Sequence, residues 1–94
     1  MTMEDADNPD PVWHVYLLEC ADGTFYCGIA KDLQKRLAEH NGHLPGGARY
    51  TSGRRPVRLL GSRLCIGKNE ALKLELAVKA RPRNEKLLVI QNGI

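Results

Sequence analysis

Five side chains in this sequence have the chemical types needed to hydrolyse a phosphodiester bond. They are Tyr16, Tyr26, Arg36, His40 and Glu75. Tyrosine and histidine can carry a proton, arginine can bind phosphate oxygens through its planar fork, and glutamate can hold Mg²⁺. Each of these residues also has an ordinary structural explanation, so their placement in the fold decides between the two interpretations.

The segments around the two tyrosines predict a pair of antiparallel strands. Residues 12–20 and 24–30 are rich in β-branched and aromatic side chains, and Ala21-Asp22-Gly23 between them is typical of a hairpin turn. A three-residue loop with Gly23 in the left-handed conformation pairs Cys20 with Thr24. A two-residue Asp22-Gly23 turn would shift the pairing by one residue and separate the tyrosines, so we favour the longer loop.

The favoured register gives the hairpin two different faces. One face is apolar and suits a core, and the other combines Tyr16 and Tyr26 with His14, Leu18 and Gly28. The apolar face comprises Val15, Leu17, Phe25, Cys27 and Ile29.

A helix is predicted from Leu33 to about His40, with Asp32 as its N-cap and Asn41-Gly42 at its end. At about 100° per residue, Arg36 and His40 lie on the same side of this helix as Leu33 and Leu37. We therefore expect Arg36 and His40 to face the sheet.

The second half of the chain predicts a loop, a third strand and two helices. The loop spans residues 41–56, and the strand runs from Val57 to Cys65. Asn69 is expected to cap a helix that runs to about Ala80 and carries Glu75 within its apolar stripe. A final short helix is expected over residues 84–90, beyond Pro82.

Charge is unevenly distributed along the 94 residues. We expect residues 1–11 to form a disordered acidic tail and residues 12–94 to form a single domain. Residues 11–94 hold all fourteen basic residues and seven of the eleven acidic ones, which gives them a net charge of +7. Five arginines without an intervening acid form a block that should attract nucleic-acid phosphates: Arg49, Arg54, Arg55, Arg58 and Arg63.

The composition also bounds the class of protein. The apolar runs are far shorter than the roughly 20 residues of a membrane helix, and three unclustered cysteines do not form a disulfide framework. The acidic first ten residues are unlike a signal peptide. We therefore expect a cytoplasmic globular protein that does not interact with membranes.

Several motifs, in order and covering about residues 12–90, resemble those of the GIY-YIG nuclease family and its short stand-alone bacterial members. Val15-Tyr16-Leu17-Leu18 and Tyr26-Cys27-Gly28 are similar to the paired motif that names the family. Lys31-Asp32-Leu33-Gln34-Lys35-Arg36 is similar to the helix that ends in the family's essential arginine. Further similarity lies at His40, in the segments Ala48-Arg49-Tyr50-Thr51 and Arg54-Arg55-Pro56-Val57, and at Glu75.

The resemblance implies an α+β fold, in which helices flank a small three-stranded antiparallel sheet. It also implies a metal-dependent endonuclease that acts on DNA, in repair or processing, with Mg²⁺ or Mn²⁺ held by Glu75. Tyr16 or Tyr26 would then be the base, Arg36 would bind phosphate, and His40 would orient the tyrosine or the phosphate. Positive charge nearby is expected to lower the pKa of the catalytic tyrosine from about 10.

The same resemblance places nucleic acid at Gly28, where a bare strand would admit a phosphate, and at Arg49, Tyr50, Arg54 and Arg55. DNA is the expected partner, with RNA as an alternative. Larger members reach their targets through extra domains, so a protein partner is a further expectation for a short chain.

The sequence departs from the family pattern at three positions. His14 and Cys27 replace a glycine and an isoleucine of the paired motif, and Leu87 stands where several nucleases have an asparagine. Two other functions of the same fold therefore stay open: a nucleic-acid-binding module without catalysis, and a subunit of a repair complex. A Cys27–His40 nucleophile pair is disfavoured by the mid-strand position of the cysteine. A zinc site using Cys20, Cys65, His40 and His43 is disfavoured by the spacing of these residues.

Overall fold

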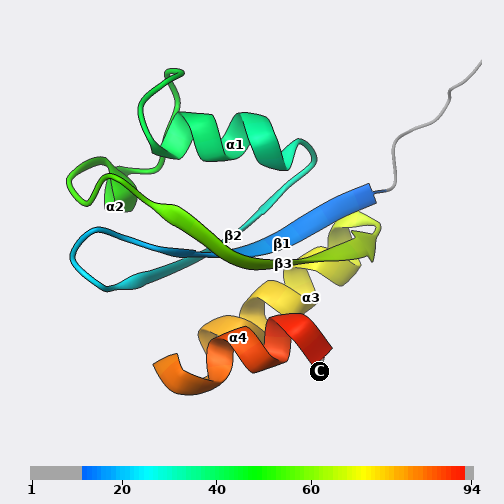
Figure 1. Cartoon of the computed structure of the whole chain (residues 1–94). Helices are drawn as coiled ribbons and strands as arrows, with labels where there is room; N and C mark the ends of the chain where they lie inside the picture. The colour runs from blue at the N-terminus through cyan, green and yellow to red at the C-terminus, as the bar shows by residue number, and fades with distance from the viewer. Residues whose placement is uncertain (1–11, 93–94) are drawn as a thin grey trace, which may run out of the picture.

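The computed structural model describes residues 12–92, and the predicted acidic tail lies outside these residues. Within them, a three-stranded antiparallel sheet lies between two layers of helices (Figure 1). The elements in chain order are β1 (Val12–Glu19), β2 (Phe25–Ala30), α1 (Leu33–His40), α2 (Arg49–Ser52), β3 (Arg58–Ile66), α3 (Lys68–Lys79) and α4 (Arg83–Asn92). The expected α+β class is confirmed.

The sheet has the order β2-β1-β3, so the first strand is central. The hairpin has the favoured three-residue loop: the Cys20 amide donates to the Thr24 carbonyl at 2.8 Å, and the Gly23 amide donates to the Cys20 carbonyl at 2.9 Å. Gly23 has a φ of 84°, which is the left-handed conformation that this loop requires. Tyr16 consequently lies directly opposite Gly28.

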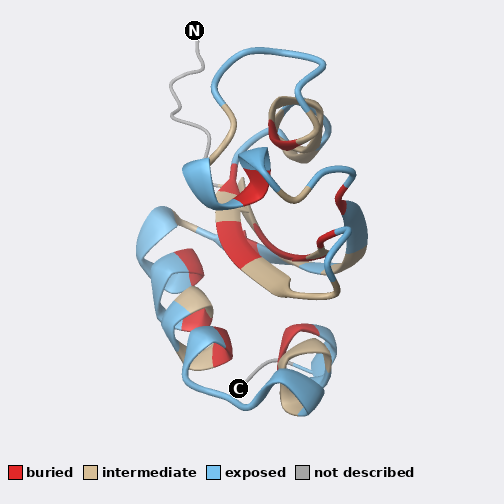
Figure 2. Ribbon diagram, turned by 90° about the vertical axis from the view of Figure 1, so that its left-hand side faces the viewer, coloured by how far each residue is buried: buried red, intermediate tan, exposed pale blue. Residues whose placement is uncertain are grey.

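The two faces of the sheet are covered by different helices (Figure 1). On one face, Val15, Leu17 and Cys27 pack in a core with buried residues of α3 and α4, whose red bands face the sheet in Figure 2. On the other face, Tyr16 and Leu18 pack with residues of α1 and the loop before β3. The predicted division of the hairpin into an apolar face and a tyrosine-bearing face is confirmed.

The first helix forms as the sequence indicates. The Asp32 carboxylate accepts a hydrogen bond from the Lys35 amide at 3.0 Å, and Asn41 ends the helix. The Asn41 side chain then exchanges two hydrogen bonds with the backbone of Val57, at 2.7 and 3.0 Å. The end of α1 is thereby fixed to the residue before β3.

Four features of these elements differ from the sequence-based expectation. The loop over residues 41–56 contains the short helix α2, and β3 begins and ends one residue later than expected. Asn69 does not cap α3: Gly67 is the N-cap residue, and Asn69 lies inside the first turn. Glu70 accepts a hydrogen bond from the Ile66 amide at 2.8 Å, so the turn is held against the end of β3 by Glu70. The final helix is also longer than residues 84–90.

No helix within residues 12–92 is long and apolar enough to cross a membrane.

We predict that Gly28→Ala destabilises the protein by about 1–3 kcal/mol, because the added methyl overpacks the interior. A Cβ at Gly28 would lie 2.5 Å from the Tyr16 hydroxyl oxygen and 2.7 Å from its ring carbon Cζ. The measurement is urea unfolding. Gly53→Ala is the matched control, because Gly53 has a φ of −95° and no atom within 4 Å of its added Cβ. Equal stability of the two variants would contradict this account of Gly28.

Candidate active site

Three polar side chains form a hydrogen-bonded cluster in the interior between the sheet and α1. Tyr16, His40 and Thr51 have 1%, 0% and 0% of their surface exposed. The Tyr16 hydroxyl lies 2.7 Å from His40 Nε2, and His40 Nδ1 lies 2.9 Å from Thr51 Oγ1. The Thr51 hydroxyl donates to the Ala48 carbonyl at 3.0 Å. Every polar group of this buried cluster therefore has a partner, as burial requires.

Arg36 lies one helical turn before His40 and borders the same cluster. Its Nη1 atom donates to Glu39 Oε1 at 2.6 Å and to the Gly46 carbonyl at 2.8 Å. The guanidinium also interacts with the Tyr16 hydroxyl, and 28% of its side chain is exposed. The predicted orientation of Arg36 and His40 toward the sheet is confirmed, and Arg36 joins the buried cluster to the surface.

Burial controls the protonation of the cluster. It raises the pKa of Tyr16 to about 12, although the nearby Arg36 acts in the opposite direction. Burial also lowers the pKa of His40 to about 4, with the charge of Arg36 adding to the effect. The expectation that a neighbouring arginine lowers the pKa of the catalytic tyrosine is therefore wrong for Tyr16, because desolvation outweighs the cation.

Tyr26 extends this cluster toward the surface through aromatic contacts. Its ring meets the His40 ring edge-on at a centroid distance of 5.1 Å and stacks on Tyr50 at 5.8 Å. The Arg54 guanidinium lies 4.0 Å from the centroid of the Tyr50 ring. Arg54 is held in that position by hydrogen bonds to Asp22 at 3.0 Å and to the Tyr50 carbonyl at 2.7 Å.

A hollow of about 230 Å³ lies beside the edge strand β2, where residues of both helical layers meet. Tyr26 and Tyr50 contribute from the α1 side, and Lys79 and Lys86 contribute from α3 and α4. The rest of the lining consists of Leu17, Phe25 and Cys27. This hollow connects the aromatic contacts on one face of the sheet with the cations on the other.

Glu75 lies on α3, in the layer opposite to Arg36 and His40. Its side chain is 17% exposed, and its Oε2 atom is 3.2 Å from Lys79 Nζ. Lys79 in turn lines the hollow beside β2. Glu75 is thus connected to the hollow through Lys79, whereas Tyr16 and His40 lie on the opposite face of the sheet, under α1.

The model for the GIY-YIG catalytic domain matches residues 12–87. This chain belongs to the GIY-YIG family. The family is one of nucleases, and the expected resemblance to its short stand-alone members is confirmed by the relatives that the chain matches.

The similar proteins share the uncharacterised designation UPF0213. One from Nitratidesulfovibrio vulgaris strain Hildenborough is 49% identical, over 83% of this chain and 69% of the relative. One from Staphylococcus saprophyticus is 42% identical, over 85% of this chain and 95% of the relative.

Two solution NMR structures are also similar. The Bacillus halodurans UPF0213 protein is 35% identical, with a TM-score of 0.52 over 87% of this chain and 85% of the other. The E. faecalis protein EF2693 is 31% identical, with a TM-score of 0.59 over 85% and 83%.

The departures from the GIY-YIG pattern have structural explanations. Cys27 is buried in the apolar core, where burial raises its pKa to about 12, and it lies on the face of the sheet opposite to His40. Such a thiol is a poor nucleophile, which agrees with the rejection of a cysteine mechanism. Leu87 packs against the same core. A leucine at this position therefore contributes to packing.

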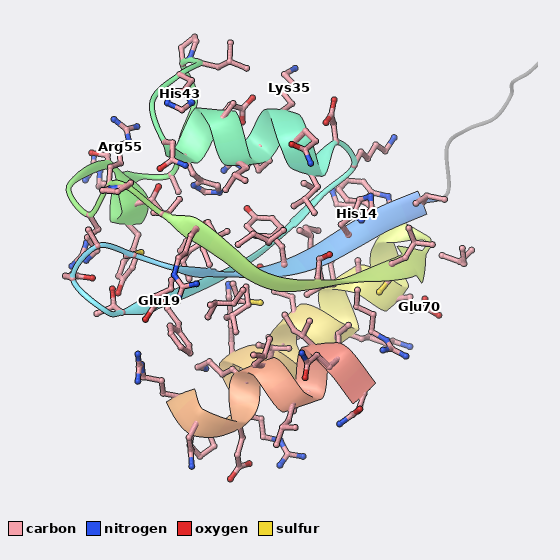
Figure 3. The ribbon with its side chains drawn as sticks, viewed as in Figure 1. His14, Glu19, Lys35, His43, Arg55 and Glu70 are labelled. Carbon is pink, nitrogen blue, oxygen red and sulfur yellow. The ribbon has the colours of Figure 1, made fainter. Side chains whose placement is uncertain are left out.

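Only some of the residues predicted to contact nucleic acid are accessible to a ligand. Arg49 and Tyr50 are exposed on α2. Arg55 donates to the His40 carbonyl at 2.7 Å, and Figure 3 shows it beside the end of α1. Gly28 does not admit a phosphate in this structure, because the Tyr16 ring and hydroxyl occupy the space over it.

The arginine block is largely committed to contacts within the described residues. Arg54 and Arg55 donate as described above, Arg58 pairs with Glu19, and Arg63 donates to the Gln91 carbonyl at 2.8 Å. A block of like charges in the sequence thus becomes a set of tertiary contacts, and its attraction for phosphate is smaller than the count of arginines suggests.

Sequence reasoning missed four residues of this site. Thr51 is buried only because α2 forms within the predicted loop, and no local pattern indicates that helix. Glu39 appeared to belong to the outer side of α1, yet it pairs with Arg36. Lys79 and Lys86 reach the hollow through the packing of α3 and α4.

The available side chains fit a metal ion whose coordination shell is completed by substrate and water. Residues 12–92 contain no group of three or more metal-ligating side chains. Glu75 supplies one half-buried carboxylate, and the Lys79 ammonium group already compensates its charge. Mg²⁺ is commonly held by one or two carboxylates together with phosphate oxygens and waters, so a single glutamate suffices as the protein ligand.

We predict that the free energy of unfolding falls by about 2 kcal/mol between pH 7 and pH 5 because of His40. The pKa of His40 is lowered to about 4 in the folded protein, against about 6.5 unfolded. The unfolded chain therefore binds more protons in this window, and stability rises with pH.

The measurement is urea unfolding at several pH values. His40→Gln should flatten the dependence, whereas His43→Ala should preserve it, because His43 is exposed in the loop beyond α1 (Figure 3). An unchanged slope in His40→Gln would refute the assignment.

Proposed function

We propose that this protein is a metal-dependent endonuclease that hydrolyses phosphodiester bonds in DNA, in repair or processing. The observation that carries the proposal is the hollow at the edge of β2. Tyr26 and Lys79 line it, Lys79 contacts Glu75, and the Tyr26 ring meets His40. A proton carrier from one helical layer therefore lines the hollow together with Lys79 from the other layer, and Lys79 pairs with the carboxylate that we assign to the metal.

Of the two tyrosines, Tyr26 is the one we assign to the attacking water. Tyr16 is 1% exposed, its hydroxyl bonds to His40, and its pKa is raised to about 12. Tyr26 is half-buried and lines the hollow. Tyr26 therefore orients or deprotonates water, while Tyr16 and His40 position the Tyr26 ring from the interior.

In the proposed reaction, Tyr26 first releases its hydroxyl proton to solvent; the water oxygen then bonds to phosphorus, and the proton of the water passes to the Tyr26 oxygen. The bond from phosphorus to the leaving oxygen breaks, and that oxygen takes a proton from solvent. Arg36 stabilises the negative charge that develops on the phosphate oxygens. Glu75 would hold Mg²⁺ or Mn²⁺, which supplies Lewis-acid polarisation of the phosphate when bound.

We predict that Glu75→Ala and Arg36→Ala each lower DNA cleavage by at least about 100-fold while the protein stays folded. Cleavage is measured with Mg²⁺ or Mn²⁺ on labelled single strands, duplexes, flaps and four-way junctions. Glu85→Ala and Arg81→Ala are matched controls, because these two residues pair with each other at 3.1 Å and neither lines the hollow. Circular dichroism and thermal unfolding verify folding of each variant.

Two results would contradict the assignment. Full cleavage by Glu75→Ala, with lowered stability, would make Glu75 a structural partner of Lys79. DNA binding by the wild type without cleavage of any substrate would favour a binding module of the same fold, or a subunit that requires a partner.

We also predict different effects for the two tyrosines. Tyr26→Phe should lower cleavage by about 100-fold with little change in stability, since it removes the hydroxyl that meets water. Tyr16→Phe should cost about 1–2 kcal/mol of stability, because it leaves His40 Nε2 without its partner. Rate measurements paired with urea unfolding separate the two effects. Cleavage by Tyr26→Phe at the wild-type rate would exclude Tyr26 as the proton carrier.

A further inference from the structure

The polar groups from Tyr16 to Ala48 form one continuous chain of hydrogen-bond donors and acceptors. The Tyr16 hydroxyl bonds to His40 Nε2. His40 Nδ1 bonds to Thr51, and Thr51 bonds to the Ala48 carbonyl. The Arg36 guanidinium lies next to the Tyr16 end of this chain. The chain therefore links β1, α1 and α2.

The Ala48 end of this chain fixes the direction of every bond in it, because a carbonyl can only accept a hydrogen bond. The single hydroxyl proton of Thr51 goes to Ala48, so Thr51 Oγ1 must accept from His40 Nδ1. Neutral His40 then has a bare Nε2, which accepts the Tyr16 proton and leaves the Tyr16 oxygen free to accept from Arg36.

We propose that Thr51 is a positioning residue, which holds His40 in its Nδ1–H tautomer and thereby orients Tyr16 and Arg36. In the opposite tautomer, the Nε2–H group of His40 would point at the Tyr16 hydroxyl. The Tyr16 hydroxyl proton would then need another acceptor. The Arg36 guanidinium beside Tyr16 carries donors only and cannot be that acceptor. Thr51 thus controls the direction of the hydrogen bonds next to the arginine assigned to phosphate.

The charged and titratable groups around His40 agree with a neutral ring. Arg36 and Glu39 of α1 and Arg55 of the following loop act on it, and the two arginines disfavour an imidazolium. Tyr16 of β1 and Tyr26 of β2 contact the ring through their aromatic rings. A neutral imidazole has two tautomers, and Thr51 supplies the acceptor that selects one of them.

The consequence for catalysis rests on the proposed function, but the state of His40 does not. We expect ¹⁵N-detected NMR at pH 7 to show a protonated Nδ1 and a bare Nε2 for His40 in the wild type. Thr51→Val removes the acceptor with little change in shape. It should lower the ratio of Nδ1–H to Nε2–H by about tenfold, the effect of one lost hydrogen bond. Thr51→Ser keeps the hydroxyl and should retain the wild-type ratio.

If the wild-type protein cleaves DNA, Thr51→Val should cut about 10- to 100-fold more slowly, because misplacing a binding group by about 1 Å can cost up to about 100-fold in rate. Thr51→Ser should recover most of the rate, which a merely structural defect would not predict.

An Nε2–H tautomer in the wild type, or the same tautomer ratio in a folded Thr51→Val, would overturn the proposal. The tautomer of the wild-type protein can be measured without any variant. The proposal can therefore be refuted even if Thr51→Val does not fold. If the wild-type protein shows the Nδ1–H tautomer but cleaves no DNA, the result would support the role of Thr51. It would then count only against the nuclease assignment.

Discussion

The hydrogen bond between Tyr16 and His40 constrains the structure around it more than any single apolar contact. Both side chains are buried, and an unpaired polar group there would cost about 1–3 kcal/mol. The bond fixes the height of α1 above the sheet, because His40 is the last residue of that helix. It also requires a glycine at position 28, where a Cβ would collide with the Tyr16 hydroxyl.

The second nitrogen of His40 extends this constraint to the following loop. Nδ1 needs a partner, and Thr51 reaches it only because residues 49–52 form a turn of helix. The Arg55 donation to the His40 carbonyl and the paired bonds between Asn41 and Val57 hold the loop from its other end. A glycine-rich segment that looks irregular in the sequence is therefore ordered by polar contacts to the end of α1.

The parts of the fold that depend on local chemistry could be predicted from the sequence. Gly23 specifies the hairpin register, and Asp32 specifies the start of α1, because both act through bonds to residues two to four positions away. The orientation of Arg36 and His40 follows from helical periodicity alone. Each of these features needs no knowledge of the rest of the chain.

The parts that depend on packing between distant segments could not be predicted in this way. The pKa of Tyr16 is raised because the side chain is buried under α1, whereas the positive charge nearby predicts a lowered pKa. The arginine block lost most of its expected freedom to contacts with Asp22, Glu19 and backbone carbonyls. Glu75 sits in an apolar stripe as expected, but its layer and its contact with Lys79 depend on how α3 crosses the sheet.

The charges of the site are compensated within the protein, and this bears on how the proposed reaction would proceed. Glu39 neutralises Arg36, and Lys79 neutralises Glu75. In the proposed reaction, a phosphate that binds Arg36 would compete with Glu39, and a cation that binds Glu75 would displace the Lys79 ammonium group. The displaced ammonium group lines the hollow and would then be free to attract phosphate. Binding of the metal would therefore favour binding of the nucleic acid, and by thermodynamic linkage the nucleic acid would favour the metal.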